Sequence, residues 1–170
     1  MSDGDPFTIE FALSTSGVSD VQSGRPPGGG SVRITTADGK REYDLSLFTY
    51  SFEEFLEAVP EMLRGGHGGI STEDTTHLVL EREDDSRGHV TICFSRDAIE
   101  DPERRLLPRD DRPLDAVVPL SVIVDEVVTA AEDLIDHIEQ LNESAVEREW
   151  FRDLNADLEE ARSVAEEHLQ

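Results

Sequence analysis

Residues 120–141, LSVIVDEVVTAAEDLIDHIEQL, contain the most regular apolar pattern in the chain. Apolar side chains recur there at alternating spacings of four and three residues, which places them on one side of an α-helix. The members of this stripe are Leu120, Val124, Val127, Ala131, Leu134, Ile138 and Leu141. A stripe of this kind is typical of a helix that packs against a sheet or another helix, so we expect a long amphipathic helix here.

The residues before this helix alternate between apolar and polar in several short runs, which predicts β-strands with one buried face. One run covers 7–13, and two more, 32–36 and 43–47, flank Asp38-Gly39. An Asp-Gly pair between two such runs is a strong hairpin signal, because both turn residues tolerate positive φ. A second hairpin is predicted over 77–94. The fold class is therefore α+β, with an antiparallel sheet of five or six strands covered on one face by the long helix.

Two further helices are expected. Ser51 and Glu54 form a capping box at the start of one, and Pro60 predicts a kink or an early end near Val59. Ser144 and Glu147 form a capping box at the start of the other.

We expect residues 1–143 to form one α+β domain, in which 14–30 is a flexible loop rich in Gly, Pro and Ser. Residues 144–170 are expected to form an acidic C-terminal helix that extends this domain.

The chain is strongly acidic. Its 170 residues include 39 acidic and 15 basic side chains, a net charge of −24, and only one of the basic residues, Lys40, is a lysine. Such a surface argues against binding to nucleic acid or an anionic membrane, and it is the pattern expected for a protein of a salt-filled cytoplasm. The start MSDGDPFT has no features of a signal peptide, so we expect a cytoplasmic protein.

No motif in the sequence carries a recognisable chemistry. Cys93 is the only cysteine, and a glycine-rich stretch at 25–31 lacks the lysine of a phosphate loop. His77 and His89, on the two arms of the second hairpin, are too few for a metal site, so we expect neither a metal nor a cofactor. His67, flanked by glycines, gives the alternative hypothesis of a small hydrolase or ligand-binding enzyme that uses His67 with a carboxylate.

Half of the net charge lies in the last quarter of the chain. From Asp125 onward there are fifteen acidic and three basic residues. This acidic end, with the neighbouring aromatics Trp150 and Phe151, leads us to predict a surface that binds a basic protein partner. The residues predicted to take part are Trp150, Phe151, Asp153 and Asp157. Self-association through the stripe of the long helix is a further alternative.

The order of these predicted elements resembles that of small immunity-type proteins of bacterial toxin systems. The resemblance covers roughly residues 7–142: the first strand, the Asp38-Gly39 hairpin, the helix Ser51-Phe52-Glu53-Glu54-Phe55-Leu56, the hairpin from His77 to Phe94, and the long helix. The C-terminal helix departs from it. The resemblance implies a non-enzymatic protein that binds another protein, of the immunity, adaptor or chaperone kind.

Overall fold

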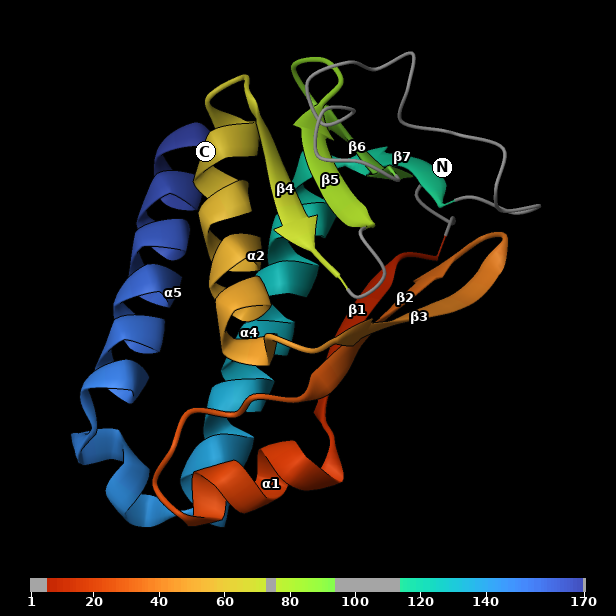
Figure 1. Ribbon diagram of the computed structural model, residues 1–170. Helices are drawn as coiled ribbons and strands as arrows, with labels where there is room; N and C mark the ends of the chain where they lie inside the picture. The colour runs from red at the N-terminus through yellow and green to blue at the C-terminus, as the bar shows by residue number, and fades with distance from the viewer. Residues whose placement is uncertain (1–5, 73–75, 94–113, 170) are drawn as a thin grey trace.

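The computed structural model describes residues 6–72, 76–93 and 114–169. Figure 1 shows two antiparallel sheets beside a layer of helices, which confirms the α+β class. The strands are divided over two sheets of three and four strands, whereas a single sheet was predicted. Sequence alternation identifies strands but not which of them pair, and α2 separates the first three strands from the rest along the chain.

The first sheet contains β1, β2 and β3, all antiparallel, with β2 in the centre. Its strands cover Thr8–Leu13, Gly30–Thr36 and Gly39–Leu45. The predicted hairpin is confirmed, but its two turn residues are Ala37 and Asp38, since Thr36 pairs with Gly39. Gly39 begins β3 with a φ of 123°, a value that favours glycine. Val32 and Ile34 of β2 are buried and belong to the hydrophobic core.

The predicted loop over 14–30 is wrong for its first part, because Thr15–Gln22 forms the helix α1. The Ser14 side chain caps this helix by accepting a hydrogen bond from the Gly17 N–H. Val21 is fully buried, and the side-chain amide of Asn142 donates to the Val21 carbonyl at 3.0 Å. Contacts with distant residues therefore hold a helix that the local apolar pattern does not indicate.

Helix α2 covers Phe48–Leu63 and begins three residues before the predicted start at Ser51. Ser51 and Glu54 do not form a capping box. Instead the Ser51 hydroxyl donates to the carbonyl of Ser71, and Glu54 accepts from the Ser71 N–H at 2.9 Å. Both side chains thus join α2 to strand β4, and α2 continues through Pro60 to its last turn.

The second sheet is antiparallel and has the strand order β4-β5-β6-β7. The strands cover His67–Ser71, His77–Arg82, Arg87–Cys93 and Asp115–Pro119. The predicted hairpin over 77–94 is confirmed by β5 and β6, and Phe94 lies outside the described residues. Strand β4 was not predicted, since its glycines indicate a loop. Gly68 is needed because a Cβ there would lie 2.4 Å from that of Ala58 on α2.

The predicted long helix is confirmed as α4, Leu120–Leu141, and six of its seven stripe residues are buried. A 3₁₀ turn, Glu143–Glu147, then leads into α5, Glu149–His168. Asn142 caps the 3₁₀ turn, in place of the predicted capping box at Ser144. Helix α5 packs against α2 and α4, and its apolar side chains join the same core as the rest of the chain.

None of the described helices combines the length and the apolar character that a membrane span needs.

Candidate partner-binding face

Helices α2 and α5 lie side by side at one edge of the molecule (Figure 1). On α2 three of the acidic residues, Glu53, Glu57 and Glu61, recur every four positions, so they follow one line along the helix surface. Those of α5 lie opposite this line. We call the set the carboxylate face; it consists of Glu53, Glu57, Glu61, Asp153, Asp157 and Glu160.

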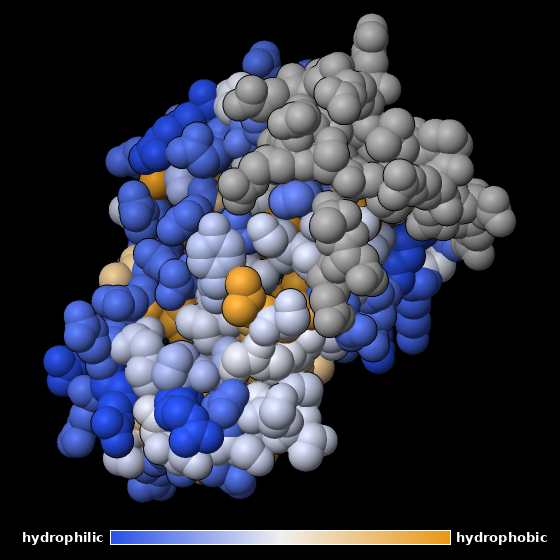
Figure 2. All heavy atoms as spheres, viewed as in Figure 1, coloured by the Kyte–Doolittle hydropathy of each residue, from blue (hydrophilic) through white to orange (hydrophobic). Residues whose placement is uncertain are grey.

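The packing of apolar residues brings these carboxylates together. In α2, Phe52 and Leu56 are buried directly next to Glu53 and Glu57 in the sequence. In α5, Leu158 is buried directly after Asp157. The helices contact each other through such apolar residues, and the acidic residues at the margins of the contact then face one another. Hydrophilic side chains cover the surface over α5 (Figure 2).

A groove of about 210 Å³ lies between the two helices. Buried Leu56 and Pro60 contribute its apolar part. The charged residues that line it are Glu57, Glu61, Arg64, Asp157 and Glu160. Four carboxylates against one guanidinium leave the groove strongly negative, and this lining suits a side chain with an apolar stem and a cationic head.

On this face the ionised forms of two carboxyl groups, those of Glu53 and Asp157, are disfavoured. Partial burial raises the pKa of Glu53, and the nearby negative charges, led by Asp157, raise it further. Partial burial likewise raises the pKa of Asp157, and Glu57 is the leading charge that adds to the rise. Burial is the larger cause for both groups, and repulsion between carboxylates of the two helices adds to it.

Of the four residues predicted to bind a partner, Asp153 and Asp157 belong to the carboxylate face, with Asp153 exposed and Asp157 half-buried. Phe151 is buried in the core at 4% exposure. Trp150 is half-buried, and its indole N–H donates to the Gly24 carbonyl at 3.1 Å, so it joins α5 to the segment after α1. A contact between either aromatic and a partner stays a prediction.

The sequence interpretation missed the acidic residues of α2. Adjacent acidic pairs such as Glu53-Glu54 and Glu159-Glu160 carry no signal in so acidic a chain. The informative spacing is the four-residue repeat of Glu53, Glu57 and Glu61. That repeat marks one side of a helix, but it does not tell which other helix lies next to it.

The three histidines considered as site residues, His67, His77 and His89, lie on the second sheet. His67 begins β4 opposite Glu81 of β5 and is half-buried, so the hypothesis of an enzyme that uses His67 stays untested. His77 and His89 are not cross-strand neighbours, because His77 pairs with Cys93 and His89 with Glu81. Among the described residues no cluster of three or more His, Cys, Asp or Glu is arranged to hold a metal ion.

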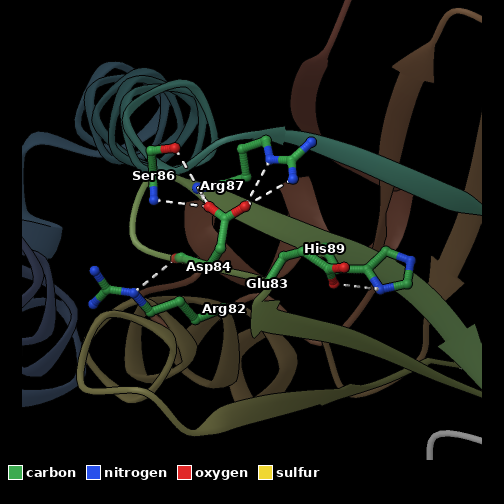
Figure 3. A network of polar contacts seen from close by, with 6 residues as sticks. All are labelled: Arg82, Glu83, Asp84, Ser86, Arg87 and His89. Atoms are coloured by element: carbon green, nitrogen blue, oxygen red, sulfur yellow. Dashed lines mark hydrogen bonds and ion pairs between the residues drawn. The ribbon is translucent and has the colours of Figure 1, made fainter.

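A second charged cluster surrounds the turn between β5 and β6 (Figure 3). Asp84 accepts hydrogen bonds from the backbone N–H groups of Ser86 and Arg87, and the Arg87 guanidinium pairs with it at 2.8 Å. The hydrogen bond from the Arg87 side chain is the main cause that lowers the pKa of Asp84 from 3.8 to about 2. Arg82 donates to the Leu63 carbonyl at 2.6 Å, which ties this turn to the end of α2.

His89 lies near the same turn and faces two carboxylates. Its Nε2 lies 2.5 Å from Asp115 of β7, and its Nδ1 lies 3.7 Å from Glu83 (Figure 3 shows the Glu83 side). The short contact joins β6 to β7, as expected for a structural role. The arginines that the sequence concentrates between 104 and 112 lie outside the described residues.

No family model and no curated protein matches the chain. A solved structure described as "CdiA-CT/CdiI toxin and immunity complex from Enterobacter cloacae" contains a similar chain, with 13% sequence identity and a TM-score of 0.39. The alignment covers 75% of this chain and 99% of that one. A similarity this low carries no argument about function.

Proposed function

We propose that this protein is a non-enzymatic interaction module, of the immunity, adaptor or chaperone kind, that binds a basic protein partner through the carboxylate face. The observation that supports the proposal is the raised pKa of both Glu53 and Asp157 on a face that the fold holds together. The apolar contacts of α2 and α5 maintain like charges in proximity, at a cost in stability that a cationic partner would relieve.

The groove supports a partner with long basic side chains. An arginine or lysine can place its methylene groups against Leu56 and Pro60, while its cationic head meets Glu57 and Asp157. The surrounding negative potential would also accelerate the encounter with a basic surface. Binding by such a face does not require a bound metal or a catalytic group.

Affinity capture tests the proposal in two stages. The tagged protein is first used as bait in a lysate of its native host, and a stoichiometric partner is identified by mass spectrometry. Binding of the purified partner is then measured by calorimetry for the wild type and for the variant E53Q/E57Q/D153N/D157N. We expect the variant to bind at least roughly tenfold more weakly, since it loses several charge contacts.

The matched control is D125N/D133N/D136N/E139Q, which removes four exposed carboxylates from α4. It changes the net charge by the same amount, so it separates the loss of charges on the carboxylate face from the effect of net charge on binding. Equal affinity of the two quadruple variants would contradict the proposed binding face. A captured partner with an acidic surface would contradict the proposed chemistry.

A further inference from the structure

The free edge of the first sheet has features of a self-complementary interaction surface. Strand β3 forms one edge of this sheet, and no described strand pairs with its outer side. At the opposite edge, β1 meets α4, where the Ile9 N–H donates to Glu126 at 3.1 Å. In Figure 1 the β2–β3 hairpin extends away from α2 and α5, so β3 lies far from the carboxylate face.

The backbone of β3 is suited to accept another strand. Its seven residues, Gly39–Leu45, pair with β2 in one unbroken register, without a bulge and without proline. Every second residue of an antiparallel edge strand directs its N–H and C=O away from the neighbouring strand. Natural edge strands are usually protected by bulges, prolines or charges, and of these devices β3 has only charges.

The charges of β3 form a pattern that complements itself. Lys40, Glu42 and Asp44 are exposed on one side of the strand. In an antiparallel pair of two β3 strands centred on Glu42, Lys40 of each copy lies opposite Asp44 of the other. Two-fold symmetry produces this contact twice.

The neighbours within the sheet leave these two charges available. Lys40 is opposite Thr35 on β2, and Asp44 is opposite Ser31, so neither has a charged cross-strand neighbour in its own sheet. Glu42 does have one: Arg33 pairs with it at 3.0 Å. The central Glu42 residues of the two copies would therefore meet with their charges already compensated.

The local net charge also favours a second copy as the occupant. The hairpin residues 30–45 carry three basic and three acidic side chains, whereas the whole chain has a net charge of −24. Two copies repel each other over most of their acidic surface, but this hairpin is neutral. Its charged residues are Arg33, Asp38, Lys40, Arg41, Glu42 and Asp44.

From this pattern we propose that two copies of the chain associate through antiparallel pairing of their β3 strands, forming a continuous six-stranded sheet. The partner is a second copy of the same chain, and the recognition chemistry is backbone hydrogen bonding with two Lys40–Asp44 contacts. Because this surface and the carboxylate face lie on different elements, the failure of either proposal leaves the other intact.

Charge exchange at Lys40 and Asp44 tests the inference by sedimentation velocity of the full chain in moderate salt. We expect the wild type to dimerise, and Lys40→Asp and Asp44→Lys each to be monomeric, because each places like charges opposite one another. An equimolar mixture of the two single variants should form a heterodimer. The double variant K40D/D44K should dimerise as the wild type does.

The controls are Arg152→Asp on α5 and Asp136→Lys on α4, exposed positions where the net charge changes by the same amounts. They should leave dimerisation unchanged. A wild type that stays monomeric at the highest soluble concentration would overturn the proposal. So would single variants that associate as strongly as the wild type, or a mixture that fails to associate although circular dichroism shows both variants folded.

Discussion

Two acidic regions of this protein use carboxylates in opposite ways. At the β5–β6 turn, Asp84 lies among hydrogen-bond donors, and its pKa is lowered to about 2. On the carboxylate face, Glu53 and Asp157 are partly buried and lie among like charges, and these two causes raise the pKa of each. The charge of Asp84 therefore stabilises the fold, while the charges of Glu53 and Asp157 oppose it. The comparison therefore separates a carboxylate whose charge is compensated within the fold from carboxylates whose charges are not.

The largest effect should come from the apolar contact that forces the carboxylate face together. Leu158 is 2% exposed on α5, between Asp157 and the core. Leu158→Ala should lower the free energy of unfolding by about 2–5 kcal/mol, through lost burial and the cavity left behind. Urea denaturation measures this change. A loss no larger than that of the exposed substitution Asp136→Asn would show that α5 does not pack on the core as described.

The second-largest loss of stability should appear at the β5–β6 turn. Asp84→Asn removes the ion pair with Arg87 and should lower the urea midpoint at neutral pH. Because the folded pKa of Asp84 lies below its ordinary value of 3.8, the stabilisation is complete above that value and is lost as the pH falls towards about 2. The difference between variant and wild type should therefore disappear in acid. Asp85→Asn, at the neighbouring exposed position, is the control, and an equal loss there would refute the role of Asp84.

Neutralising carboxylates of the carboxylate face should raise the free energy of unfolding, whereas Asp84→Asn should lower it. Glu53→Gln and Asp157→Asn should each raise the free energy of unfolding at neutral pH by about 0.5 kcal/mol, a value reduced by solvent screening. Since both folded pKa values are raised, the gain is full at neutral pH. This gain in stability decreases as the pH falls through the raised pKa values towards the ordinary ones, 4.5 for Glu53 and 3.8 for Asp157. If either substitution destabilised the protein at neutral pH, the two regions would not differ as proposed.

The smallest effect should be the response to salt. Added sodium chloride screens the repulsion on the carboxylate face, so it should raise the urea midpoint of the wild type more than that of the double variant E53Q/D157N. The same salt weakens the attraction between Asp84 and Arg87. The stability difference between the wild type and Asp84→Asn should therefore shrink as salt increases. Parallel salt curves for all three proteins would contradict the comparison.

Part of the candidate site was predictable. Asp153 and Asp157 were identified because acidic residues accumulate near the C-terminus, a property of composition alone. The contribution of α2 was not predictable, since Glu57 and Asp157 are about a hundred positions apart in the chain. Phe151 illustrates the same limit: it was predicted to take part in partner binding beside Trp150, and its burial at 4% exposure depends on how α5 packs on the core.

The sequence by itself determined the α+β class, the hairpin around Asp38-Gly39 and the helix over 120–141, because periodicity and turn chemistry are local properties of the chain. Only the tertiary structure decided which strands share a sheet and that Thr15–Gln22 is helical. It also decided that Ser51 and Glu54 bind the backbone of Ser71 in place of capping a helix. These features depend on contacts between distant segments, and such contacts form only when the apolar faces of several elements are buried together.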